Sequence, residues 1–299
     1  MYWQTTRYKI DLCQPRVMGI VNVTPDSFAD GGAHADTAAA LAHCERLVKE
    51  GADMLDIGGE SSRPGAQSLS ATDELARVLP VLRGAMTLGV AISIDTCKAE
   101  VMRAALDLGV DIVNDILALR AAGATLSIAA HPSCGVCLMH MRGDPRTMQD
   151  APDYDDAVAE VGAFLAARAE AVVAAGVAPD RIVLDPGIGF GKRAGHNLAL
   201  LARQHELLAL GHPLLVGWSR KSTLGTLTGR AVQDRLPASL AAALAAVQRG
   251  ASIVRVHDVA ATVDALRVWS AAGLAPIPGS PALHNPSGPR PTLNHIEPT

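Results

Sequence analysis

Aromatic residues are scarce in this sequence. They make up 3% of its 299 residues, whereas hydrophobic residues of all kinds make up 49%. The core must therefore be built mainly from Val, Ile, Leu and Ala, a composition that suits buried parallel strands covered by Ala-rich helices. Charged residues are also few, at 19%, so the chain can bury a large core and general disorder is not expected.

Several other features are missing. The formal net charge is −4 and no long basic run exists, so a nucleic-acid-binding surface is not expected. Residues 1–14 lack the apolar stretch of a signal peptide. The Ala-rich stretches at 163–178 and 238–247 are too short, or too interrupted by charges, to span a membrane. The five cysteines lie in apolar segments, which predicts free thiols in a reducing cytoplasm.

Cys134 and Cys137 have the CxxC spacing of a redox or zinc half-site. A structural zinc site normally needs four ligands, and no second Cys or His pair follows nearby. The pair is therefore interpreted as two buried residues at the start of a strand.

Short apolar runs alternate with longer segments of helical periodicity. The eight runs, each of strand length, are residues 17–21, 54–57, 91–94, 111–113, 136–139, 182–184, 214–216 and 252–256. The helical segments between and after them include 37–50, 71–82, 98–108, 154–175, 198–207, 237–248 and 260–272. Eight βα units in about 260 residues predict an α/β fold with a single (β/α)8 TIM barrel. An open doubly wound sheet is the alternative.

The composition shifts at residue 276. The segment 276–299 is rich in Pro, Ser, His and Asn and has no apolar period. We therefore expect a catalytic barrel domain over residues 1–275, followed by a disordered C-terminal tail.

Polar residues stand where nearly every predicted strand ends, and this end carries the active site in α/β barrels. Buried charges are costly unless they are paired or bind a ligand, so a purely structural protein would have little use for so many on one rim. In chain order they include Asn22, Asp56, Arg63, Asp95, Asn114, His140, Asp185, Ser219, Lys221, Arg255 and His257.

This set divides by its chemistry. Asp95, Asn114 and Asp185 supply acceptors, and a carboxylate that accepts two parallel hydrogen bonds matches a flat heterocycle such as a 2-amino-4-oxopterin. The positively charged members suit phosphate or carboxylate groups; they are Arg63, Arg220, Lys221, Arg255 and His257. One site with both halves predicts a heterocycle that carries an anion.

Some of these positions also have a structural interpretation. Asp56 is expected to be a structural hydrogen-bond partner, His140 a core histidine, and Asp258 the partner of a neighbouring Arg. Asp185 could simply begin a turn. Arg255 and His257 are favoured as functional, because their two-residue spacing puts both side chains on one face of a strand.

The segment 187–192, Gly-Ile-Gly-Phe-Gly-Lys, is neither a GxGxxG nor a Walker A phosphate loop, because its spacing is wrong. We expect its glycines to let the backbone lie close to a flat ligand, with Phe190 as an apolar wall.

Eight motifs resemble, in order, those of the dihydropteroate synthases. They are NVTPDSF at 22–28, DIGGESSRPG at 56–65, SIDT at 93–96, NDI at 114–116, LMHM at 138–141, DPGIGFGK at 185–192, SRKS at 219–222 and RVHD at 255–258. The resemblance spans roughly residues 17–269. One motif alone would be weak, but eight in order, one for each strand end, are highly specific. Ser62 departs from the Thr that is frequent in the family, although the hydroxyl is kept.

The resemblance implies a reaction and a set of roles. The family displaces diphosphate from a 6-hydroxymethyl-7,8-dihydropterin ester with the amine of p-aminobenzoate, which yields the folate precursor 7,8-dihydropteroate. The pterin would be held by Asp95, Asn114, Asp185 and Lys221. The diphosphate would be held by Asn22, Arg63, Arg255 and His257, with Mg²⁺ near Asn22. The p-aminobenzoate pocket would be formed by Ser62, Pro64, Phe190, Ser219 and Lys221, with Phe28 closing over it.

Further expectations follow from the resemblance. Diphosphate would leave before the amine attacks, with Asp95 and Asp185 favouring the cationic pterin and Lys221 and Arg255 completing the catalytic group. Loops after the first two barrel strands would be mobile and order over the site. Ser219 and Arg220 would open a helix that receives the benzoate carboxylate. Sulfonamides would compete with p-aminobenzoate, and a homodimer is expected. The alternatives are a pterin-dependent methyltransferase and an inactive pterin-binding paralogue.

Overall fold

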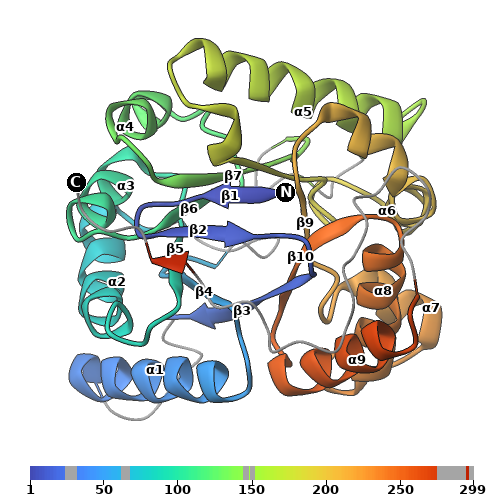
Figure 1. Cartoon of the computed structure of the whole chain (residues 1–299), viewed down its shortest axis with the longest axis horizontal. Coiled ribbons are helices and arrows are strands. Elements are labelled where there is room, and N and C mark those ends of the chain that lie inside the picture. The colour runs from blue at the N-terminus through green and yellow to red at the C-terminus, as the bar shows by residue number, and fades with distance from the viewer. Residues whose placement is uncertain (24–31, 62–67, 144–147, 149–151, 275–293, 296–299) are drawn as a thin grey trace.

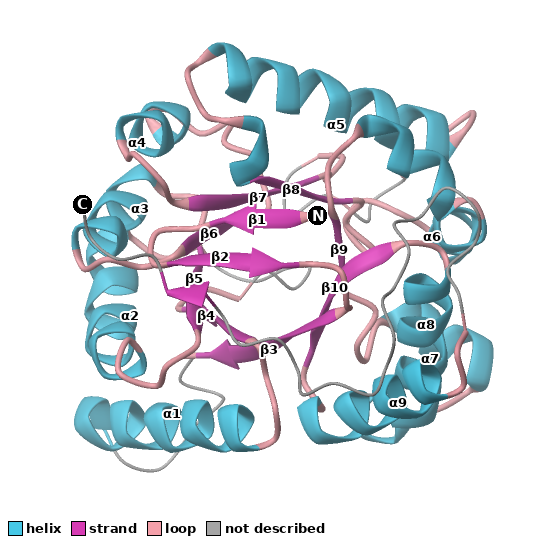
Figure 2. Cartoon of the chain, viewed as in Figure 1, coloured by secondary structure: helices cyan, strands magenta, loops and turns pink. Residues whose placement is uncertain are grey.

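Eight parallel strands close into a barrel, in the order β10-β3-β4-β5-β6-β7-β8-β9 (Figures 1 and 2). The computed structural model describes residues 1–23, 32–61, 68–143, 148, 152–274 and 294–295, with the backbone alone for 32–36 and 294–295. The barrel strands are β3 Arg16–Asn22, β4 Met54–Gly58, β5 Ala91–Asp95, β6 Ile112–Asp115, β7 Gly135–Met139, β8 Ile182–Asp185, β9 Leu214–Val216 and β10 Ala251–Val256. The predicted TIM barrel is confirmed, and an open sheet is excluded.

Helices surround the barrel on the outside (Figure 2). They are α1 Gly32–Lys49, α2 Ala71–Ala85, α3 Ala99–Asp107, α4 Ala124–Ala130, α5 Ala157–Ala174, α6 Ala194–Ala202, α7 Ser222–Thr228, α8 Leu236–Gln248 and α9 Val259–Ala271. The strands are almost wholly buried because side chains of the barrel interior cover one face and the helices cover the other. Of the α-helices in the described residues, α4 and α7 were not predicted, because their seven residues each are too few to show an amphipathic repeat.

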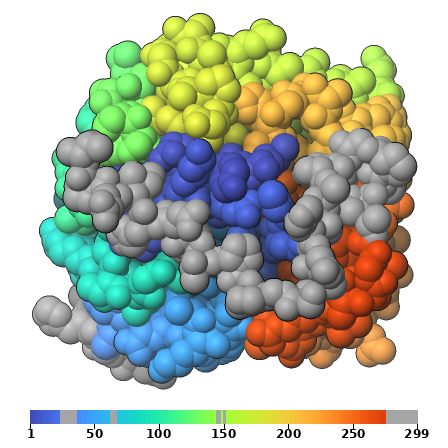
Figure 3. Space-filling model, in the orientation of Figure 1, coloured from blue at the N-terminus to red at the C-terminus, as the bar shows by residue number. Residues whose placement is uncertain are grey.

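A β-hairpin that the periodicity did not predict fills one end of the barrel. Its strands are β1 Tyr2–Gln4 and β2 Tyr8–Asp11, and β11 Asn294–His295 pairs with β2 to make a three-stranded sheet. Trp3 and Ile10 are 0% exposed and pack on inward-facing residues of the barrel strands, among them Ile112 and Val183. Figure 3 shows the dark-blue N-terminal residues in the middle of this face.

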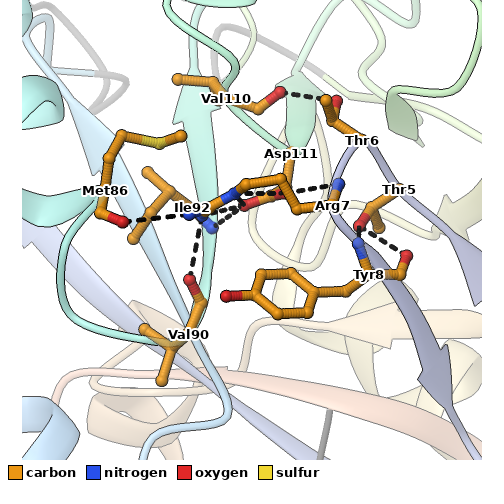
Figure 4. A network of polar contacts seen from close by, with 9 residues as sticks. All are labelled: Thr5, Thr6, Arg7, Tyr8, Met86, Val90, Ile92, Val110 and Asp111. Carbon is orange, nitrogen blue, oxygen red and sulfur yellow. Dashed lines mark hydrogen bonds and ion pairs between the residues drawn. The ribbon is translucent and has the colours of Figure 1, made fainter. Parts of the chain in front are cut away.

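The hairpin is tied to the barrel by a polar network (Figure 4). Arg7 donates to both carboxylate oxygens of the fully buried Asp111, and it also donates to the carbonyls of Met86 and Val90. Oδ2 of Asp111 also accepts a hydrogen bond from the backbone N–H of Ile92, at 2.8 Å. These residues precede or begin β5 and β6, so the hairpin closes the N-terminal ends of the strands and leaves the opposite end for the site.

The C-terminal ends of the strands therefore form the mouth of the barrel. Of the tail, the structure describes only residues 294–295, so the boundary predicted at 275 and the disorder predicted beyond it stay predictions. No described helix is both long enough and apolar enough to cross a membrane.

Candidate active site

The strand register lines up four polar or small positions around half of the barrel mouth. Asn22 on β3 lies beside Gly58 on β4, Gly58 beside Asp95 on β5, and Asp95 beside Asn114 on β6. A Cβ at Gly58 would lie 3.3 Å from the Cβ of Asp95, so the glycine leaves room next to this carboxylate. Three predicted site residues thus share one layer because parallel strands place equivalent positions side by side.

Arg255, which lies lower on β10 beside Met18 of β3, reaches this layer with its side chain. Its Nε donates to Oδ2 of Asp56 at 2.5 Å, and its second guanidinium nitrogen donates to Oδ2 of Asp95 at 2.8 Å. Asn114 donates from Nδ2 to the same Asp56 oxygen at 3.0 Å. The guanidinium fork therefore fixes two carboxylates from two neighbouring strands, which a lysine could not do with the same geometry.

Asp56 has a more central place in the site than was predicted from the sequence. It was expected to be a structural hydrogen-bond partner, and it is one, but its partners are Arg255 and Asn114, two predicted site residues. The carboxylate is 0% exposed. Among the described residues its Oδ1 has no hydrogen-bond partner, nor does the buried Oγ of Ser93, the neighbour of Asp56 on β5. Unpaired buried polar atoms of this kind are costly without a ligand or water, so they mark the floor of the site as polar.

The opposite side of the mouth combines Asp185, Lys221 and Phe190. Asp185 ends β8, is 6% exposed, and accepts from the backbone N–H of Gly187 at 2.7 Å. The Lys221 ammonium lies 4.2 Å from the centre of the Phe190 ring. Gly189 makes room for it, since a Cβ there would come within 3.2 Å of Lys221 Cδ. The structure thus places a carboxylate, an ammonium and an aromatic wall in one region.

Two glycines of the segment after β8 have a use that was not predicted. Gly187 and Gly191 have positive φ values of 67° and 58°, and Cβ atoms there would lie 1.9 Å from the carbonyl oxygen of His140 and 2.4 Å from that of Arg142. The absence of a Cβ at these two positions allows the loop to pack directly on the backbone that follows β7. His140 is buried, as expected, with its ring edge against Phe164.

Ser219 and His257 form a pair between the loops that follow β9 and β10. Ser219 Oγ lies 2.9 Å from Nδ1 of His257 and accepts from the His257 backbone N–H at 3.2 Å. Burial, followed by repulsion from Arg255, lowers the pKa of His257 to about 3. The imidazole is therefore neutral at pH 7. In the tautomer whose Nδ1 accepts from the serine hydroxyl, Nε2 carries the proton and can donate to an anion.

Three expectations concern Arg220: two are corrected and one is confirmed. The helix after β9 begins at Ser222, not at Ser219, because Arg220 has φ = 59°, which no helix accommodates. Arg220 was grouped with the anion-binding cations, but its guanidinium pairs with Asp258 through contacts of 2.6 and 3.0 Å. The pairing expected for Asp258 is thereby confirmed. Arg220 ties together the two loops that carry Ser219 and His257.

Burial shifts the ionisation of the groups at the mouth. It raises the pKa of Asp95 to about 7, against the attraction of Arg255, and it raises that of Asp185 against the hydrogen bond from Gly187. It lowers the pKa of Lys221 to about 8, although Asp185 attracts the ammonium. Opposing shifts on groups that face one another are typical of catalytic sites.

Some predicted residues lie outside the described residues. These are Phe28, Ser62, Arg63 and Pro64, together with most of the two loops expected to move over the site. Within the described part of the chain, no group of three or more His, Cys, Asp or Glu side chains could hold a metal ion. Cys134 and Cys137 are both buried, as the structural interpretation expected.

The fold and the mouth define a class of protein: a barrel enzyme that binds a polar heterocycle and an anion side by side. The sequence profile of a family described as "Pterin binding enzyme" matches residues 18–257. The dihydropteroate synthase of Neisseria meningitidis serogroup B is 55% identical over 278 residues, which cover 91% of this chain and 98% of the relative.

Solved structures agree. The Yersinia pestis dihydropteroate synthase, solved with a sulfonamide drug complex, superposes with a TM-score of 0.86 at 45% identity and covers 91% of this chain and 99% of its own. Two Xanthomonas albilineans dihydropteroate synthase structures give TM-scores of 0.84 and 0.82 at 51% and 48% identity. The first contains 4-aminobenzoic acid and covers 91% of this chain; the second contains 7,8-dihydropteroate and covers 90%, and both match the whole of the other chain.

The chain therefore belongs to the dihydropteroate synthase family of pterin-binding enzymes. Its class is that of a transferase in folate biosynthesis, and a methyltransferase is not favoured.

Proposed function

We propose that this chain joins p-aminobenzoate to the methylene carbon of 6-hydroxymethyl-7,8-dihydropterin diphosphate, releasing diphosphate and forming 7,8-dihydropteroate. The observation that carries the proposal is the contact of Arg255 with Asp56 and Asp95. It sets a fixed cation beside buried carboxylates at one mouth, which is the pairing that a cationic heterocycle and an anionic leaving group need.

The pterin is held by Asp95, Asn114, Asp185 and Lys221 in this proposal. The two carboxylates accept from the N–H and NH2 groups of the ring, and the Asn114 amide and the ammonium of Lys221 donate to its acceptors. Support comes from their placement on β5, β6, β8 and the loop after β9 of one barrel, around a polar floor that includes Asp56.

The diphosphate is assigned to Asn22, Arg255 and His257, with Arg63 from outside the described residues. Mg²⁺ fits this group only as an ion that keeps most of its water ligands. A single amide oxygen at the end of β3 is no cage, but Mg²⁺ commonly keeps its waters and binds through one or two protein oxygens and substrate phosphates. Asn22 would hold the ion, which would neutralise charge on the diphosphate.

The p-aminobenzoate is assigned to Phe190, Ser219 and Lys221, with Ser62 and Pro64 from outside the described residues. Phe190 offers an apolar ring face, and the Lys221 ammonium beside it bridges the pterin and benzoate halves. Ser219 sits where its loop meets His257, close to the anion side of the site.

The reaction then follows an SN1-like course. The bond from the methylene carbon to the diphosphate oxygen breaks first, and its electron pair leaves with the diphosphate, whose charge Arg255 and the His257 N–H stabilise. Asp95 and Asp185 stabilise the cation that spreads over the pterin. The lone pair of the arylamine attacks the methylene carbon, and the nitrogen then loses a proton to the departed diphosphate or to solvent. The exclusion of water during this step by the loops after β3 and β4 stays a prediction.

Diphosphate release tests the function directly. We expect the purified chain to release diphosphate continuously only when pterin diphosphate, p-aminobenzoate and Mg²⁺ are all present, and to stop when the ion is chelated. A sulfonamide should raise the apparent KM for p-aminobenzoate without lowering the maximal rate. A folded chain that binds the pterin but releases no diphosphate would instead show the inactive paralogue.

The alkaline limb of the pH profile tests the role of Lys221. Its pKa of about 8 lies below the usual 10.5, so the ammonium is charged below pH 8 and is lost as the pH rises past it. We expect kcat/KM for the pterin substrate to fall about tenfold per pH unit above this value. The side chain in Lys221→Arg stays charged at alkaline pH. This variant should therefore show no fall of kcat/KM above pH 8, even if its kcat/KM is lower at every pH. An unchanged limb in Lys221→Arg would assign it to another group.

We further propose a homodimer that resides in the cytoplasm. Leu227 on α7 and Val268 on α9 are 55% and 71% exposed, on helices that both pack against α8. The free thiols of all five cysteines suit a reducing compartment. A sedimentation mass near that of one 31.0 kDa chain would contradict the dimer, and recovery outside the cytoplasmic fraction would contradict the location.

A further inference from the structure

Lys192 is a buried lysine that none of the roles above uses. It is 3% exposed, and no ion pair joins it to a carboxylate among the described residues. Its Nζ instead lies within hydrogen-bond distance of four acceptors: Nδ1 of His140 at 2.8 Å, and the carbonyl oxygens of Gly187, Phe190 and His140 at 2.9, 3.0 and 3.3 Å. Burial lowers the pKa of Lys192 to about 7. When protonated, its ammonium has three donors, and these acceptors can satisfy it fully.

The four acceptors come from two segments that the ammonium joins. His140 follows β7, whereas Gly187 and Phe190 belong to the loop after β8. The two carbonyls of the loop turn toward one point, where they would repel each other without a cation. A loop with three glycines of positive φ has little stiffness of its own, so this point of attachment limits its conformation.

The other side of the same loop faces the site. The Gly187 backbone N–H donates to the carboxylate of Asp185, and the Phe190 ring lies against the ammonium of Lys221. Thus the residues whose carbonyls Lys192 holds are also the residues that contact a pterin-binding carboxylate and form the benzoate wall. A shift of about 1 Å in such groups can cost about 10²-fold in rate.

We propose that Lys192 is a positioning residue for the reaction: its ammonium gathers the carbonyls of Gly187 and Phe190 onto His140 and thereby sets Asp185 and Phe190 in place for the two substrates. The inference rests on the proposed function, because the roles of Asp185 and Phe190 do. A merely structural lysine would lower the stability of the fold and the fraction of active protein, which reduces the apparent kcat and leaves both KM values unchanged.

Arg181 offers a matched control. It is 4% exposed and donates to the carbonyls of Ile128, Pro132 and Cys134, but it precedes β8 at the end of the barrel closed by the hairpin. Lys192→Met and Arg181→Met each remove a buried cation that holds carbonyl groups. Lys192→Met removes a cation at the mouth of the barrel, whereas Arg181→Met removes one at the opposite end.

The test measures melting temperature, kcat and both KM values for the two variants and the wild type. We expect both variants to melt at lower temperature, Arg181→Met to keep both KM values, and Lys192→Met to raise the KM for pterin diphosphate and for p-aminobenzoate at least about tenfold. Lys192→Met with KM values within twofold of an active wild type would overturn the proposal. If Lys192→Met does not fold, Lys192→Gln, which keeps a donor, is judged by the same criterion.

The outcome is separable from that of the proposed function. An inactive wild type would contradict the function, while calorimetric titration with pterin diphosphate would still compare the affinities of wild type and Lys192→Met. Equal affinities in that titration would overturn the role of Lys192, and an affinity at least tenfold weaker in the variant would support it.

Discussion

Replacing Arg255 by alanine is expected to lower kcat/KM about 10³-fold. The guanidinium bridges Asp56 and Asp95 and is the one described arginine whose fork contacts two carboxylates from neighbouring barrel strands. Its loss removes the fixed charge that stabilises the leaving diphosphate and also frees the two carboxylates to move. Steady-state kinetics with each substrate varied in turn measures the effect. A loss smaller than tenfold would show that Arg255 has no direct part in the reaction.

Two further variants separate charge from geometry at this position. Arg255→Lys keeps the charge but not the bidentate fork, so we expect it to recover no more than about tenfold of the lost activity. Arg255→Ala also leaves the fully buried Asp56 with Asn114 as its one partner among the described residues, which should cost about 3 kcal/mol or more of stability. Adding Asp56→Asn should restore part of that stability and none of the activity. Restored activity would contradict the role of the cation.

Replacing Trp3 by alanine is expected to cost about 3–5 kcal/mol in free energy of unfolding. The side chain is 0% exposed, packs with the apolar residues that line the closed end of the barrel, and donates from Nε1 to the carbonyl of Arg181 at 2.9 Å. Its removal leaves a cavity in the plug and an unpaired carbonyl. Urea unfolding monitored by circular dichroism measures the loss.

The adjacent Tyr2→Ala variant is the control for this prediction. Tyr2 belongs to the same strand but is 46% exposed, so its loss should change the stability by no more than about 0.5 kcal/mol. Both variants should keep the wild-type KM values, because the hairpin lies at the end of the barrel away from the mouth. Equal stability of the two variants would contradict the function of the hairpin as a plug.

The barrel was predictable because each barrel strand is buried on both faces and must therefore be a continuous apolar run. Residues 214–216 were predicted to form a strand and are β9, and the predicted run at 54–57 differs from β4 by one residue. The polar residues that end the strands were equally visible, since position along a strand decides which end of a parallel barrel a residue reaches. This is why Asn22, Asp95, Asn114 and Asp185 could be assigned to one rim.

The partners of these residues could not be predicted in the same way. Asp56 and Arg255 are 199 positions apart, and no local pattern says that closing the barrel brings β4 and β10 within reach of one guanidinium. Arg220 and Arg255 both follow or end a predicted strand, so their sequence contexts are similar. Nothing in those contexts indicates that Arg220 pairs with Asp258. The hairpin was missed because its few apolar residues look like a surface segment until the open end of the barrel supplies their contacts.

The sequence by itself determined the fold class, the family and the identity of the residues at the mouth, because strand periodicity and motif chemistry are local properties. Only the tertiary structure decided which charges pair, that Asp56 organises the floor, that His257 is neutral, and that Lys192 holds the loop carrying Phe190. Those features depend on desolvation and on distances between distant strands, and both arise only when the barrel closes.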